Sequence, residues 1–315
     1  MKNFEQISKK IQALTIDNPR QPSNIKWYNI VNPEKKEIAY LKKKFNFKDK
    51  HLEASLVRIS AQRPMIFEEK DYVFIILHFP VIEKGQVVPG EIEFFVGHGY
   101  LITLHDNKIK TLNNFCEYCK NDSVFLESYN LESSAVLLYE ILEKLIQDSY
   151  ALLDKNNIEI NKLEKGIFES EQEVVTSQLL ILKRNIINIR RIVENHKNIM
   201  KKLTEMKSSL VSKEQIMKYY GTLAEHSERI WEFSDTQKEI IDSLQNTSES
   251  ISDNKTNNIM KTLTVLSAIL MPMNLLATIL GMNLNPGTYP FSLVIVSMIV
   301  MAIVLLIFFR KKRWL

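Results

Sequence analysis

The segment from Thr262 to Phe309 contains no charged side chain, although 25% of the whole chain is charged. A helix of about 20 apolar residues crosses a hydrocarbon core roughly 30 Å thick. Residues 260–281 and 291–309 each meet that length, and residues 282–290 between them contain two prolines and a glycine that turn the chain. The sequence therefore predicts two transmembrane helices joined by a short loop.

Basic residues flank these predicted spans on one side of the membrane only. Lys255 and Lys261 precede the first span, the tail 310–315 is basic, and the loop has no basic residue. Basic flanks stay in the cytoplasm, so we expect a two-span protein of the cell membrane with both termini cytoplasmic and the loop extracellular. The cluster either anchors this topology or forms a ring near a pore mouth, and it consists of Arg310, Lys311, Lys312 and Arg313.

The N-terminal residues alternate charged and apolar side chains and lack the unbroken apolar core of a signal peptide, so the region before the spans is predicted to remain cytoplasmic. The two cysteines, Cys116 and Cys119, suit a reducing compartment and are too few for a structural zinc site. A net charge of +4 does not indicate nucleic acid. No nucleotide-binding, metalloprotease or nucleophile-elbow motif occurs, so we expect neither an enzyme nor an organic cofactor.

One face of the first predicted span is polar. At about 100° per residue, one narrow arc contains Asn257, Met260, Thr264, Ser267, Met271, Asn274, Thr278 and Gly281. Amides and hydroxyls are unfavourable in hydrocarbon unless they face a partner or water, so this arc is predicted to point inward in an oligomer. It either holds helices together or lines a pore in which Leu263 and Met271 are apolar constrictions.

The region before the spans divides by composition. Residues 1–132 are predicted to form a mixed α/β domain, with strands IKWYNIV, DYVFIILHF, EIEFFVG and YLITLH and a hairpin at Gly97–Gly99. Residues 133–259 lack most turn signals and form a long-helix stalk. Three helices are expected, at about 133–169, 173–208 and 213–281, the last with Leu223, Ile230 and Gln237 in a heptad.

The end of the first span carries a recognisable motif. Gly281-Met282-Asn283 resembles the signature of CorA-type magnesium transporters, the two-transmembrane GxN metal ion transporter family. The preceding segment NKTNNIMKTLTVLSAILMP, the terminal RKKRWL and the segment QRPMIFEEKDYVFIILHF are similar to that family in order and spacing. The resemblance covers most of the chain.

The resemblance implies an α+β membrane protein that forms a funnel-shaped homopentamer around a central pore. Its partners would be copies of itself, the lipid bilayer and divalent cations, with no nucleic acid. Asn283 would form the outer selectivity ring, presented by Gly281 and Met282. The pore would be lined by Asn257, Leu263, Met271, Asn274 and Thr278, and the basic cluster would form a collar at the inner mouth.

The implied function is passage of Mg²⁺, with Co²⁺ or Ni²⁺ as surrogates, down its electrochemical gradient. Mg²⁺ gives up its water reluctantly, so a ring of amide oxygens would hydrogen-bond the hydrated ion without stripping it. The family uses acidic side chains for metal sensing, but the matching positions here are Ala54 and Thr222, which leaves Glu53 and Glu225 as nearby substitutes. The outer loop also lacks the acidic residues of many relatives.

Two other functions fit the same residues. One is transport of zinc or another transition metal, whose branch of the superfamily is often marked by isoleucine at the position of Met282. The other is a membrane-anchored coiled-coil scaffold or sensor without ion flux, in which the polar arc is only a packing seam. A measurement of ion flux separates the scaffold, which passes no ions, from a transporter.

Overall fold

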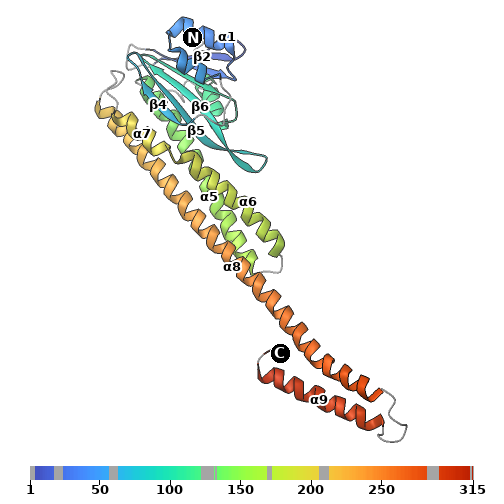
Figure 1. Cartoon of the computed structure of the whole chain (residues 1–315). Helices are drawn as coiled ribbons and strands as arrows, with labels where there is room; N and C mark the ends of the chain where they lie inside the picture. The colour runs from blue at the N-terminus through green and yellow to red at the C-terminus, as the bar shows by residue number, and fades with distance from the viewer. Residues whose placement is uncertain are drawn as a thin grey trace. The chain divides into compact units, whose positions relative to one another are not determined.

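The computed structural model describes residues 4–17, 24–56, 63–121, 131, 133–168, 172–205, 213–281, 291–312 and 314. The chain divides into two compact units, Met1–Ser243 and Leu244–Leu315 (Figure 1). The first contains a mixed sheet with helices, and the second contains the end of one long helix and a second helix. The finer subdivision at residues 132/133 and 259/260 stays a prediction.

A seven-stranded sheet organises the first unit, in the order β1-β2-β3-β7-β6-β5-β4. Neighbours are antiparallel except for the parallel pair β3 and β7. The strands are β1 (Phe4–Gln6), β2 (Ile11–Ile16), β3 (Ile25–Val31), β4 (Met65–Glu68), β5 (Tyr72–Glu83), β6 (Gln86–Gly97) and β7 (Tyr100–His105). The four predicted strands are confirmed as β3, β5, β6 and β7, and the sequence did not reveal β1, β2 and β4.

The predicted hairpin between β6 and β7 is confirmed. Gly99 at its turn has φ +72°, a conformation that a side chain disfavours. Gly97 at the end of β6 also has to be glycine, because a Cβ there would lie 2.1 Å from the ring of Tyr100. These two glycines fix the register that places Glu93 opposite Leu104.

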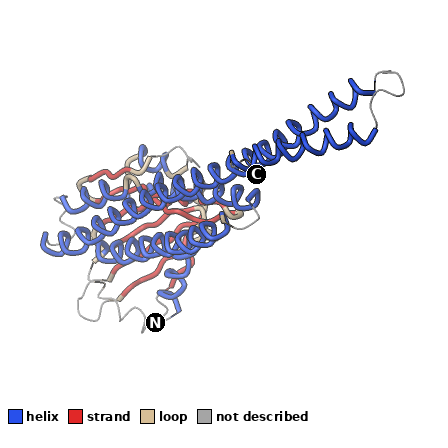
Figure 2. Tube along the Cα trace, turned by 90° about the horizontal axis from the view of Figure 1, so that it is seen from below, coloured by secondary structure: helices blue, strands red, loops and turns tan. Residues whose placement is uncertain are grey.

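Each face of the sheet is covered by helices. On one face, Phe74, Ile76 and Phe95 pack with residues of α1 (Lys35–Phe45) and α2 (Asp49–Ala54). On the other face, Ile75 and Phe94 belong to the core that holds the remaining helices of this unit (Figure 2). Those helices are α3 (Lys110–Asn121), α5 (Ser134–Ile167), α6 (Gln172–Val193), α7 (His196–Glu205) and the first part of α8 (Lys213–Gly281).

The prediction of a single helix at 173–208 is wrong in one respect, because the chain turns at residues 194–195 between α6 and α7. The turn brings His196 into the core, where its Nε2–H donates to the carbonyl oxygen of His78 at 2.6 Å. Burial lowers the pKa of His196 to about 4 and keeps the imidazole neutral. The structure thus ends α6 at Val193 and begins α7 at His196, whose imidazole is hydrogen-bonded to β5.

The predicted heptad of α8 is confirmed in the first unit. Leu223, Ile230 and Gln237 are each 0% exposed. The Nε2–H of Gln237 donates to the carbonyl oxygen of Leu153 at 2.7 Å. The hydroxyl of Tyr220 donates to the carbonyl oxygen of Ala135, also at 2.7 Å. Both acceptors lie on α5, so α8 is fixed against α5 by polar bonds as well as by apolar packing.

We predict that Leu223→Ala lowers the stability of the first unit by about 2–5 kcal/mol, because it removes apolar volume from a closed core. Thermal unfolding followed by tryptophan fluorescence measures the change. Met217→Ala, which truncates an exposed side chain on the same helix, is the control. Equal melting temperatures for the two variants would contradict the packing.

Buried neutral histidines also predict a pH dependence. His196 and His105 have pKa values lowered to about 4 by burial, below the ordinary 6.5. As the pH falls, the unfolded chain therefore binds protons before the folded chain does. The free energy of unfolding is full above about pH 6.5 and decreases as the pH drops towards 4, by about 1.4 kcal/mol per pH unit for each group. His196→Gln keeps a donor for the His78 carbonyl but cannot titrate, so its melting temperature changes less over this range than that of His98→Gln in the exposed turn.

Candidate ion pathway

Among the described residues, α8 is the one helix whose length and apolar composition suffice to cross a membrane, between Met217 and Ile279. It contains the first predicted span and continues without interruption through Pro272. α9 (Phe291–Lys311) follows, and in both views it lies beside the last part of α8 (Figures 1 and 2).

The residues of the predicted polar arc up to Thr278 are exposed in a single chain. Met271 is 77% exposed, and Met260 and Leu263 are each 55% exposed. The exposed members of the predicted pore lining are Asn257, Met260, Leu263, Thr264, Ser267, Met271, Asn274 and Thr278. The structure therefore places all eight on one uncovered face of α8.

Two hydroxyls of this face are held by the backbone of their own helix. Thr264 donates to the carbonyl oxygen of Met260 at 2.7 Å, and Thr278 donates to that of Asn274 at 2.8 Å. Because the hydroxyl proton is used within the helix, the lone pairs of each oxygen remain free to accept a hydrogen bond from outside it. The hydroxyls on this face thus act as acceptors, which suits water bound to a cation.

The opposite side of α8 is the side that packs. Val265 is only 4% exposed. The half-buried residues around it are Ala268, Ile269, Pro272, Met273 and Leu276. At about 100° per residue their arc lies roughly 150° from the polar arc. On α9 the half-buried positions repeat every three or four residues, at Met298, Met301, Ala302, Leu305 and Phe309. α9 therefore covers the apolar side of α8 and leaves the polar side open.

The two ends of the predicted pathway are described in part. Gly281 is the last residue of α8, whereas Met282, Asn283 and the rest of the outer loop lie outside the described residues. Arg310, Lys311 and Lys312 are exposed at the end of α9, and Arg313 lies outside the described residues.

The proposed metal-sensing carboxylates are not brought together within one chain. Glu53 is exposed on α2, which packs on one face of the sheet, and Glu225 is exposed on α8, whose neighbouring Leu223 packs in the core on the other face. Among the described residues, no group of three or more histidine, cysteine, aspartate or glutamate side chains is arranged to hold a metal ion.

Cys116 and Cys119 lie on α3 and are both buried and free. Burial raises the pKa of each thiol to about 12, so neither is a thiolate at neutral pH. His105 is likewise structural: its Nε2–H donates to Oδ1 of Asn29 at 3.0 Å.

Comparison with known proteins decides the family. A family model described as CorA-like Mg²⁺ transporter protein matches residues 22–311. The chain belongs to this family. The CorA-like family is one of divalent cation transporters, not of enzymes.

Curated relatives carry the same family name. The cobalt/magnesium transport protein CorA of Thermotoga maritima is 24% identical over 261 residues, which cover 81% of this chain and 73% of that protein. The cobalt/magnesium transport protein CorA of Methanocaldococcus jannaschii is 23% identical over 300 residues, covering 92% and 91%.

Solved structures share the CorA fold described above. The complete CorA magnesium transporter from Methanocaldococcus jannaschii superposes with a TM-score of 0.80 at 21% identity, covering 92% of both chains. The full-length CmaX protein gives a TM-score of 0.74 at 18% identity, covering 93% of this chain and 90% of its own. The α/β domain followed by long helices is therefore the family architecture, as the sequence predicted.

Proposed function

We propose that copies of this chain form a transmembrane pore that passes hydrated Mg²⁺ down its electrochemical gradient. The observation that supports this most is the division of α8 into two sides, one covered by α9 and one polar and uncovered. A polar side in hydrocarbon requires water or a partner, and several copies of α8 around one axis provide both.

The proposed chemistry of the pathway is neutral throughout. Asn283 forms the outer ring behind Gly281 and Met282, and Asn274 and Thr278 offer oxygen acceptors below it. Such acceptors bond the waters of Mg²⁺ while the ion keeps its tightly held shell, so it is bound weakly enough to leave. An inward-negative potential supplies about 2.3 kcal/mol per charge per 100 mV, so no nucleotide is required.

The pore closes, in this proposal, at apolar constrictions formed by Leu263 and Met271. Both side chains are more than half exposed on a single chain, at 55% and 77%, so both are available to meet their copies on a central axis. A ring of such side chains blocks ions by excluding water. Asn257, Met260, Thr264 and Ser267 complete the lining, with the basic collar of residues 310–313 at the inner mouth.

The assembly that we propose is a homopentamer with two spans per chain, 260–281 and 291–309, an outer loop 282–290 and cytoplasmic termini. In this proposal neighbouring copies bring Glu53 and Glu225 together, since the sheet separates them within one chain. They would then sense cytoplasmic Mg²⁺ in place of acidic groups at Ala54 and Thr222.

We predict that Asn283→Ala abolishes or strongly reduces Mg²⁺ uptake into liposomes under an imposed inside-negative potential, while the oligomer stays intact on size-exclusion chromatography. The reason is loss of the amide ring that accepts hydrogen bonds from the hydrated ion. Ser292→Ala, at the start of α9 and off the polar arc, is the control. Unchanged uptake in Asn283→Ala would remove Asn283 as the selectivity residue.

The same assay discriminates among ions and functions. Mg²⁺ flux competed by Co²⁺ or Ni²⁺ supports the proposal. Zn²⁺ flux that Mg²⁺ does not compete would assign the chain to transition-metal transport, and an assembled protein without any flux would make it a scaffold.

We predict that Met271→Cys is linked between copies by a short bis-maleimide, because Met271 faces the axis that the copies share. The background carries Cys116→Ala and Cys119→Ala. Leu266→Cys is the matched control. Leu266 is exposed too, at 53%, but it lies about 120° around α8 from the centre of the polar arc. Equal cross-linking at both positions in native membranes would contradict the inward orientation of the arc.

A further inference from the structure

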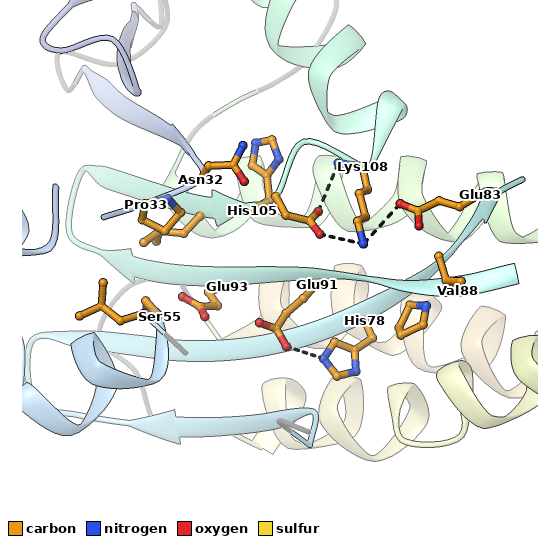
Figure 3. Close-up of a pocket in the computed structure, with 14 residues that line it drawn as sticks. Asn32, Pro33, Ser55, His78, Glu83, Val88, Glu91, Glu93, His105 and Lys108 are labelled. Carbon is orange, nitrogen blue, oxygen red and sulfur yellow. Dashed lines mark hydrogen bonds and ion pairs between the residues drawn. The ribbon is translucent and has the colours of Figure 1, made fainter. Parts of the chain in front are cut away.

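A pocket of about 580 Å³ lies in the first unit, at the face of the sheet that α2 covers (Figure 3). Ser55 and Leu56 close it from the end of α2, and Glu91 and Glu93 enter it from β6. Glu91 and Glu93 are two residues apart on one strand, so their side chains lie on the same face, about 7 Å apart along the strand. The transport pathway proposed above uses none of these residues.

Glu93 is the unusual member of this pocket. It is 4% exposed, and its Oε2 is buried without a hydrogen-bond partner in the described structure. Its neighbours in the sheet, Ile76 and Leu104, offer it no polar group, and the hydroxyl of Ser55 at the end of α2 hydrogen-bonds to its carboxyl group. A buried carboxyl oxygen without a partner is costly, so such a group indicates a ligand that completes its bonding.

A second carboxyl group, that of Glu91, lies at this end of the pocket. Glu91 accepts a hydrogen bond from Nε2 of His78 at 2.8 Å and keeps its other oxygen free of that bond. Burial, and then the charge of Glu91, raise the pKa of Glu93 to about 8, so the acid is mostly protonated at neutral pH until a cation arrives. A cation at this point would draw off that proton and pair with the carboxylate.

A second acidic group lines the other end. Lys108 Nζ lies 3.3 Å from Glu83 Oε1 and 3.4 Å from Asp106 Oδ2, so one cation faces two carboxylates (Figure 3). The apolar residues that line the pocket are Pro33, Leu56, Val88, Pro89 and Leu104. A ligand with two positively charged ends joined by an apolar chain therefore matches the lining.

We propose that this pocket binds a small aliphatic diammonium ligand, with one ammonium between Glu91 and Glu93 and the other towards Glu83 and Asp106. An ammonium donates three hydrogen bonds and satisfies the free oxygen of Glu93, while the methylene groups contact the apolar wall. A directly coordinated metal ion fits less well, because the described residues contain no group of three metal-binding side chains.

The test is isothermal titration calorimetry of the purified full-length protein with 1,4-diaminobutane, in parallel with 1,4-butanediol and with MgCl₂ at equal ionic strength. We expect saturable binding of the diamine, none of the diol, and competition by Mg²⁺ only through ionic strength. Glu93→Gln, a substitution of nearly equal shape, weakens diamine binding at least about tenfold, as expected for loss of a charge-assisted bond.

Lys108→Gln is expected to change the affinity for the diamine in the opposite direction. It removes the cation that neutralises Glu83 and Asp106, so it tightens diamine binding, a result that misfolding does not produce. Glu159→Gln, on α5 outside the pocket, leaves the affinity unchanged. The proposal is overturned if the diamine does not bind, if Glu93→Gln and Lys108→Gln shift the affinity in the same direction, or if Mg²⁺ binds at Glu93 and displaces the diamine at matched ionic strength. Mg²⁺ flux does not enter this test, so its outcome is independent of the transport proposal.

Discussion

Hydrocarbon offers no hydrogen bonds, and this constraint governs the second unit. It requires the backbone of α8 to form its hydrogen bonds within the helix. It also makes every polar side chain on that helix unfavourable unless a hydrogen-bonding partner or water contacts it. Thr264 and Thr278 meet part of the requirement by donating to carbonyls of their own helix. The amides of Asn257 and Asn274 are exposed on one chain, so in the membrane they need partners that only other copies or water provide. The two-sided helix is therefore the basis of the proposed oligomer with a water-filled axis.

In the first unit the main constraint is the burial of ionisable groups, because helices cover both faces of its sheet. His196 and His105 remain neutral and are bonded to a carbonyl oxygen and to an amide. Glu93 is also buried, but one of its oxygens has no partner in the described structure. Two of these three groups therefore tie helices and strands together, whereas Glu93 is better explained by a ligand. The same low dielectric produces both outcomes, and the available partners decide between them.

α8 belongs to both units, and its sequence changes character along its length. Before residue 244 its heptad positions are filled by core residues such as Leu223 and Ile230, and Gln237 is bonded to α5. The polar arc begins at Asn257, and after Lys261 the helix has no charged side chain. One continuous helix thus provides both part of the core of the first unit and the proposed lining of the pore.

The sequence alone determined the features that repeat locally: the four long or apolar strands, the glycine hairpin, the heptad of α8, the uncharged segment and its polar arc. Each depends on periodicity or on a turn residue, which neighbouring positions reveal. It missed β1, β2 and β4, which are short or amphipathic and become strands only by pairing with a distant partner. It also missed the break before His196, which depends on a carbonyl of β5 more than a hundred residues earlier. Only the tertiary structure decided that α9 covers one side of α8 and that Glu93 has no partner for Oε2, because both facts depend on which side chains meet across the fold.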